Sequence, residues 1–280
     1  MTNQETEAVK ASTAQAAPVA TAPDLANGSL ASIMKTPAVR SRFADVLKDK
    51  AEGFVASVLA VVNNNALLAK ATPLSVISAA MVAASLDLPI TPGLGYAAIV
   101  PFKNGKEGRT DAQFQLMARG YVQLAMRSGQ YKAIEVQPVY KGEIRSVDKF
   151  AGRYEFGTKT SEEVVGWMGY FRLLNGFEKY YYMTTDEIQQ HAIRYSQTAK
   201  KGYGLWVDNF EAMAAKTVLK LMLAKWGVLS VEMQKATTFD GSVGTDADGE
   251  PVFGEEQPAA TPQDNTAAAM VAASMAGNVG

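Results

Sequence analysis

Residues 96–129 read YAAIVPFKNGKEGRTDAQFQLMARGYVQLAMRSG, and this stretch decides the class of the fold. Its first part, Tyr96–Lys103, has the apolar composition of a strand, and Asp111–Met117 returns as a partner strand. Asn104 and Gly105 between them are typical of a hairpin turn, although the connection is longer than two residues. The stretch therefore predicts an antiparallel hairpin.

Helices and strands are expected on both sides of this hairpin. A short helix from Arg119 to Ser128 follows it directly, with Gly129 as its stop. Two helices are expected before it, from Arg40 to Val62 and from the cap residue Thr72 onward. The strands and helices expected after it are Tyr131–Tyr140, Arg153–Phe156, Val164–Leu174, Phe177–Met183, a helix from Thr185 and a long helix over Trp206–Trp226. This order predicts an α+β fold, with an antiparallel β-sheet packed with helices.

Charge is segregated along the chain. Residues 237–280 hold seven acids and no Lys or Arg, whereas residues 31–236 hold 26 basic and 18 acidic residues. The net charge of the whole chain is -1, but the net charge of residues 31–236 is therefore +8. Composition predicts disordered tails at residues 1–34 and 237–280, the second one acidic, around a folded core at 35–236. A basic core suits a polyanion, but ordinary surface charge is an alternative explanation.

Several functional classes are disfavoured by composition. The chain has no cysteine and one histidine, which argues against thiolate metal sites and His-based catalysis. It has no P-loop motif and no nucleophile with an adjacent base, so we expect no ATP site and no enzymatic activity. We see no signal peptide and no apolar stretch long enough to span a membrane, and expect a cytoplasmic protein.

The helix after the hairpin carries the first candidate binding face. Arg119, Gln123 and Arg127 lie at i, i+4 and i+8, on one polar side of the helix. Two guanidinium groups on either side of an amide suit a row of phosphates. The alternative is a solvated helix face paired with nearby acids.

The last long helix carries a second candidate face. Lys216 and Lys220 lie one turn apart, and no acid occurs between Glu211 and Glu232 to neutralise them locally. The face could contact phosphates, or the two lysines could extend over apolar surface towards water.

A glycine-rich loop precedes that helix. Lys200 and Lys201 stand next to Tyr203, which could stack on a base, whereas Trp206 is expected to belong to the core at the helix start.

Three stretches together resemble the RecT family of phage-encoded single-strand DNA-annealing proteins. They are LDLPITPGLGYAAIVPF at residues 86–102, QLMARGYVQLAMRSGQ at 115–130, and WVDNFEAMAAKTVLK at 206–220 followed by VEMQKA at 231–236. Their order and spacing match the family pattern from about residue 35 to 240. The family's basic and polar motif positions correspond to Arg119, Arg127, Lys216, Thr217 and Lys220.

The resemblance implies ATP-independent binding of single-stranded DNA and its annealing to a complementary strand. It implies a ring or helical oligomer, an exonuclease of the phage and the host single-strand-binding protein as partners, and the cytoplasm of a bacterial host as location. No cofactor is expected, and any stimulation by Mg²⁺ would need no defined site. In this hypothesis Tyr96, Phe102 and Lys103 also line the DNA groove. The alternatives are a structural, oligomeric nucleic-acid-associated protein without annealing activity, and a metal-dependent nuclease.

Overall fold

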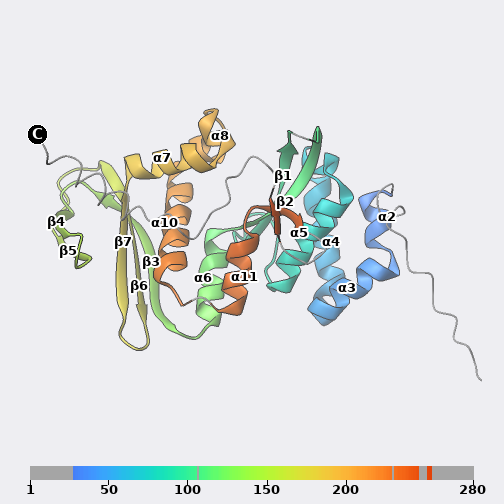
Figure 1. The fold of residues 1–280 in the computed structure, drawn as a ribbon, viewed down its shortest axis with the longest axis horizontal. Coiled ribbons are helices and arrows are strands. Elements are labelled where there is room, and N and C mark those ends of the chain that lie inside the picture. The colour runs from blue at the N-terminus through green and yellow to red at the C-terminus, as the bar shows by residue number, and fades with distance from the viewer. Residues whose placement is uncertain (1–27, 106, 229, 246–250, 254–280) are drawn as a thin grey trace, which may run out of the picture.

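The computed structural model describes residues 28–105, 107–228, 230–245 and 251–253. It confirms the α+β class, because helices pack on antiparallel sheets. Figure 1 shows two lobes along the long axis. We call them the helical lobe, which contains α2 to α5 and the hairpin β1–β2, and the sheet lobe, which contains β3 to β7 and α7 to α10. Helices α6 and α11 lie between them, and the larger apolar core contains residues of both lobes.

The helical lobe is built around α5. Its elements are α2 (Leu30–Met34), α3 (Pro37–Leu47), the short 3-10 helix η1 (Lys48–Lys50), α4 (Ala51–Asn63), a second 3-10 helix η2 (Leu68–Lys70), α5 (Pro73–Ser85), β1 (Ala97–Asn104) and β2 (Arg109–Leu116). Thr72 precedes α5 and Pro73 occupies its first position, as expected. Ala79, Ala80 and Ala83 are all buried, so small side chains let α5 lie close to the hairpin.

The single helix expected from Arg40 to Val62 is wrong, because the chain breaks after Leu47. Lys48 has φ of 52°, which a continuous helix does not allow. The break lets α3 and α4 turn their apolar sides toward each other, with the rings of Phe43 and Phe54 5.9 Å apart. Tertiary packing therefore overrides the helical periodicity here.

The sheet lobe holds the three-stranded sheet β3–β6–β7. Its strands are β3 (Tyr131–Tyr140), β6 (Val164–Leu173) and β7 (Glu178–Thr184), within a residue of the predicted bounds, and all pairs are antiparallel. Helix α10 (Phe210–Trp226) covers one face of the sheet. Gly169 permits this close contact, since a Cβ atom there would lie 2.9 Å from the sulfur of Met222.

A second hairpin projects from the end of this lobe. It consists of β4 (Ile144–Asp148), which the sequence analysis missed, and β5 (Arg153–Phe156), which it predicted. Figure 1 shows this hairpin at the end of the molecule opposite to α3 and α4.

The segment after β7 is more broken than predicted. Helices α7 (Thr185–Tyr195), α8 (Gln197–Lys200) and α9 (Leu205–Asp208) precede α10, and the break at Asn209 divides the long helix expected over Trp206–Trp226.

The C-terminal part of the chain returns to the space between the lobes. It forms α11 (Val231–Phe239), β8 (Ser242–Thr245) and β9 (Pro251–Phe253), and β8 packs near α5 and β2. The boundary predicted after Ala236 thus falls inside α11, because Met233, Ala236 and Phe239 are buried. The N-terminal boundary predicted after Met34 follows a helix, α2, whose Ile33 and Met34 are buried. Residues 1–27 and 254–280 lie outside the described residues.

Candidate nucleic-acid interface

Helix α6 (Ala118–Arg127) is positioned by the hairpin. The N–H of Met117 donates to the Tyr96 carbonyl oxygen at 2.9 Å, and the N–H of Arg119 donates to the Gly95 oxygen at 3.1 Å. At Gly120 any Cβ atom would overlap the Tyr96 carbonyl oxygen, so only glycine allows this approach. The buried side of α6 carries Tyr121 and Leu124.

The polar face predicted on α6 is present, but its two arginines differ in their contacts. Arg119 is exposed and its Nη1 donates one hydrogen bond, of 3.2 Å, to the Leu94 carbonyl oxygen. Arg127 donates from Nη1 to the Leu86 oxygen at 2.6 Å and from Nη2 to the Asp87 oxygen at 2.8 Å. Arg127 therefore ties α6 to the end of α5. Gln123 is half-buried between the two arginines.

The two lysines of α10 also differ in their surroundings. Lys220 donates to Oδ2 of Asp240 at 2.7 Å, an acid that the sequence analysis had assigned to the acidic tail. Lys216 is half-buried, and its Nζ lies 3.9 Å from the sulfur of Met117. Asp240 thus neutralises Lys220, although no acid lies between Glu211 and Glu232 along the chain. No periodic signal could have revealed this pairing, since the two residues come from different elements.

Asp240 joins three parts of the chain. Its Oδ1 accepts the N–H of Leu116 at 2.9 Å, and its Oδ2 accepts the hydroxyl of Tyr121 at 3.0 Å in addition to Lys220. The side chain is only 8% exposed. Strand β2, helix α6 and helix α10 therefore meet at one carboxylate.

The charge states at this cluster are set by burial and by the neighbouring charges. Burial would raise the pKa of the Asp240 carboxyl, but the ammonium groups of Lys220 and Lys216 hold that pKa below its ordinary value. Burial, and then the charge of Asp240, raises the pKa of Tyr121 well above its ordinary value, so the phenol remains a donor. Burial lowers the pKa of Lys216; Asp240 opposes this shift and Lys220 adds to it.

Thr217 is the least accessible of the predicted contacts. It is 7% exposed, and its hydroxyl donates to the Met213 carbonyl oxygen one turn earlier at 2.8 Å. In this conformation its polar atom serves the helix itself.

The loop before α9 presents its charges to solvent. Lys200 and Lys201 are exposed, and the side chain of Tyr203 is 55% exposed. Trp206 is half-buried and packs near Phe210, with ring centroids 6.1 Å apart, which confirms its assignment to the core.

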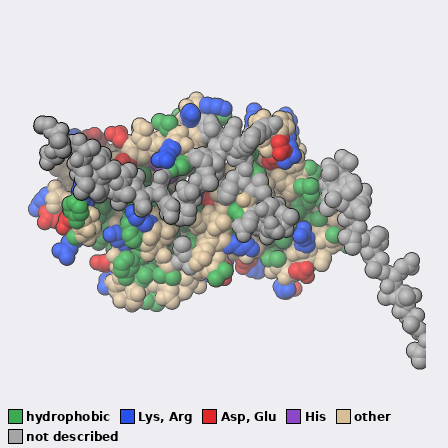
Figure 2. Space-filling model, in the orientation of Figure 1, with side chains coloured by type: hydrophobic (Ala, Val, Ile, Leu, Met, Phe, Trp, Pro, Cys, Tyr) green, Lys and Arg blue, Asp and Glu red, His purple; other side chains and the backbone are tan. Residues whose placement is uncertain are grey.

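The three candidate residues of the predicted strand Tyr96–Lys103 differ in exposure. Tyr96 is half-buried against the core, Phe102 is half-buried, and Lys103 is exposed. Figure 1 shows the end of the β1–β2 hairpin and α8 on the same side of the molecule, one from each lobe. Figure 2 shows Lys and Arg side chains along this upper edge. Exposed cations of both lobes therefore border one side.

Within the described residues, no group of three or more His, Cys, Asp and Glu side chains could hold a metal ion. Among the helices that the structure describes, none has the length and apolar character needed to cross a membrane.

Comparison with known proteins covers both lobes. A model of the RecT family matches residues 52–253, from α4 to β9. The chain is 47% identical over 206 residues to the "Uncharacterized protein YqaK" of Bacillus subtilis (strain 168), covering 73% of this chain and 69% of that protein. It is 27% identical over 228 residues to "Protein RecT" of Escherichia coli (strain K12), covering 76% of this chain and 81% of that protein.

Proposed function

The chain belongs to the RecT family, and on this basis we propose that it binds single-stranded DNA and anneals it to a complementary strand during recombination. The observation that carries the proposal is the family match, which extends through both lobes and includes the hairpin, α6 and α10. Pairing of bases supplies the driving force, so no ATP is needed. The complete activity includes the annealed duplex as product and an oligomer of this chain as the active form.

The DNA contact that we propose is made with phosphates. Lys103 near the end of the β1–β2 hairpin and Lys200 and Lys201 at the end of α8 are exposed, so a strand lying across this side meets cations from both lobes. Arg119 adds an exposed cation on α6, which lies between the lobes. Contacts to the backbone leave base edges available for pairing, which annealing requires. Tyr203, with its exposed ring, is the aromatic best placed to stack on a base.

The Lys216 and Lys220 face takes a different role in this proposal. Lys220 is paired with Asp240, and partial burial of the Lys216 ammonium lowers its pKa. A phosphate reaching these lysines would compete with the Asp240 carboxylate and favour the charged form of Lys216. We therefore expect the exposed cations to contribute most to phosphate binding and the face of Lys216 and Lys220 to contribute less. Arg127 and Thr217 should contribute least.

An annealing assay tests the function. Two complementary oligonucleotides with fluorophores at their ends are mixed with the protein, without ATP, and the rate of duplex formation is followed. We expect acceleration over the spontaneous rate, and DNA affinity that falls steeply with salt because bound phosphates release counterions. Acceleration that depends on ATP would overturn the proposal.

The same samples separate the alternatives. Binding without faster annealing would indicate a structural nucleic-acid-associated protein, and strand cleavage in Mg²⁺ would indicate a nuclease. With the annealing function we also propose the cytoplasm of a bacterial host as location, and a phage exonuclease and the host single-strand-binding protein as partners.

A further inference from the structure

The loop between α5 and β1, residues 86–96, is tied to helix α6 at both of its ends. Arg127, at the C-terminal end of α6, donates hydrogen bonds to two carbonyl oxygens at the beginning of the loop. Arg119, near the N-terminal end of α6, donates to two carbonyl oxygens at the end of the loop, those of Leu94 and Gly95. The loop therefore follows about two turns of α6.

The end of this loop is a tight turn. The N–H of Leu94 donates to the Thr91 carbonyl oxygen at 3.3 Å, with Pro92 and Gly93 between them. Gly93 has φ of 85°, which is typical of the third position of a type II turn and favours glycine there. We call residues 91–95 the Thr91–Gly95 turn. Its shape depends on a backbone conformation that other residues rarely adopt.

The turn contacts Arg119 along both the stem and the head of its side chain. A Cβ atom on Gly95 would lie 3.6 Å from Cδ and 3.8 Å from Cγ of Arg119, so the Gly95 backbone packs beside the stem. At the head, Nη1 donates to the Leu94 carbonyl oxygen at 3.2 Å. A guanidinium group carries several N–H donors in one plane. One bond to a carbonyl oxygen therefore orients the plane and leaves other donors for a ligand.

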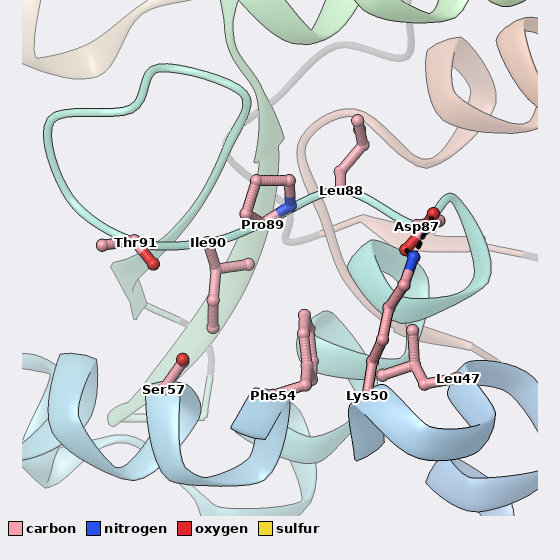
Figure 3. A pocket seen from close by; sticks show the side chains of 9 residues that line it. All are labelled: Leu47, Lys50, Phe54, Ser57, Asp87, Leu88, Pro89, Ile90 and Thr91. Carbon is pink, nitrogen blue, oxygen red and sulfur yellow. Dashed lines mark hydrogen bonds and ion pairs between the residues drawn. The ribbon is translucent and has the colours of Figure 1, made fainter. Parts of the chain in front are cut away.

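A groove separates part of the same loop from α4 (Figure 3). Its volume is about 380 Å³, and Phe54 of α4 and Ile90 of the loop point into it from two sides. Thr91 also lines the groove, so the turn begins where the loop is not packed against α4. Among the described hydrogen bonds, those that join the turn to another element go to α6. The turn and Arg119 therefore hold each other.

We propose that the Thr91–Gly95 turn positions Arg119 for DNA: the Leu94 carbonyl oxygen holds one edge of the guanidinium group, and the remaining donors face a phosphate. A long exposed side chain loses conformational freedom when it binds, and a side chain that is already oriented loses less. The inference rests on the proposed function, because it takes the phosphate contact of Arg119 from there. The turn acts through Arg119 and does not itself contact the DNA.

The variant Gly93→Ala tests the turn. Alanine disfavours φ of 85°, so the turn must change shape and carry the Leu94 carbonyl oxygen away from Arg119, although no heavy atom lies within 4 Å of the added Cβ. The matched control is Gly176→Ala in the β6–β7 turn, where φ is 89° and the surroundings are equally open. Gly93→Ala should weaken single-stranded DNA binding about threefold, the scale of ordering one long side chain. Gly176→Ala should leave the affinity unchanged.

A double-mutant cycle shows whether the turn acts through Arg119. The affinity for a short single-stranded oligonucleotide is measured for the wild type, Gly93→Ala, Arg119→Ala and the double variant. We expect Gly93→Ala to cause no further loss once the Arg119 side chain is absent. Independent losses that multiply in the double variant would overturn the proposal, because the turn would then act on DNA without Arg119. Equal losses in Gly93→Ala and Gly176→Ala, or unchanged affinity in Arg119→Ala, would overturn it as well.

NMR of the guanidinium nitrogens in DNA-free protein gives a readout that is independent of the proposed function. The signal of Arg119 is identified by its absence in Arg119→Ala. Rotation of this guanidinium group should be slower in the wild type and in Gly176→Ala than in Gly93→Ala, because the bond to Leu94 restrains it. Equal rotation in all three proteins would overturn the proposal even if DNA binds. If rotation differs as expected but the wild type neither binds nor anneals DNA, the proposed function fails, and only the orientation of Arg119 stands.

Discussion

Lys220 and Asp240 are 20 positions apart, and Nζ of the first lies 2.7 Å from Oδ2 of the second. The pair joins α10 to the turn between α11 and β8. Asp240 also accepts hydrogen bonds from Leu116 and Tyr121, so its carboxylate has few open positions left. A residue within the acidic C-terminal region is therefore part of the folded core.

We expect that breaking this pair from one side destabilises the fold. Lys220→Met leaves the buried Asp240 carboxylate with Lys216 as its remaining cation, and should lower the free energy of unfolding by about 3 kcal/mol, the lower end of the range for breaking a buried ion pair. The double variant Lys220→Met/Asp240→Asn should recover part of that loss, because the buried carboxylate is gone, and only part of it, because Lys216 then lacks its neighbouring acid. Urea denaturation measures both. The control is Lys141→Met, which removes an ion pair with Glu163 whose side chains are 61% and 60% exposed, and it should cost less than about 1 kcal/mol. Equal losses in the two single variants would contradict the role given to Asp240.

The lowered pKa of Asp240 predicts how stability depends on pH. The unfolded chain binds this proton at higher pH than the folded protein, so Asp240 contributes stability above the ordinary aspartate pKa. That contribution is lost as pH falls through the lower folded pKa. Between neutral pH and pH ~3, the wild type should lose more stability than Asp240→Asn. Parallel curves for the two proteins would show that Asp240 is not the group responsible.

Substitution of the two arginines of α6 should have different effects on DNA binding and on stability. Arg119→Ala should make the plot of log binding constant against log salt concentration for single-stranded DNA less steep by roughly 0.7, the slope expected for one phosphate contact. The free energy of unfolding should change little. Arg127→Ala should instead destabilise the protein by about 1–3 kcal/mol, since two carbonyl groups at the end of α5 lose their donor. Binding titrations at several salt concentrations and thermal unfolding distinguish the two. Reversed effects would return Arg127 to the DNA contact set.

Lys216 predicts an alkaline effect on DNA binding. Its pKa lies below the ordinary lysine value, so as pH rises it loses its charge earlier than an exposed lysine does. As the pH rises, the affinity of the wild type for single-stranded DNA should therefore begin to fall before pH ~10 is reached. In Lys216→Arg the affinity should begin to fall at a higher pH, because the guanidinium stays charged. Titrations over pH for the two proteins provide the comparison. Identical profiles would remove Lys216 from the interface.

The C-terminal region yields a prediction about truncation. Removing residues 254–280 takes away Glu255, Glu256 and Asp264 with no Lys or Arg, and should tighten DNA binding at low salt while the fold stays intact. Removing residues 237–280 also takes Phe239 and Asp240 and should unfold the chain, so this longer truncation cannot test how the acids of the tail affect DNA binding. Circular dichroism and binding at low salt check both. Unchanged affinity in the shorter truncation would show that these three acids do not weaken DNA binding.

Helices and strands were predicted well where their sequence signal spans only a few residues. The hairpin of β1 and β2, the amphipathic α6, and the strands of the three-stranded sheet follow from turn residues and periodicity, which act over a few residues. The breaks at Lys48 and Asn209 were missed, because the apolar spacing continues through both and only packing against distant elements interrupts the helix.

Local patterns in the chain were enough to predict the α+β class, the order of most elements and the residues from which a basic interface could be built. The tertiary structure decided which of those residues are accessible. In the folded protein Asp240 pairs with Lys220, Arg127 donates a hydrogen bond to the end of α5, and Arg119 is exposed to solvent. Periodicity reports which face of an element is apolar, whereas the partner of a charged side chain depends on which distant segments the fold brings within hydrogen-bonding distance.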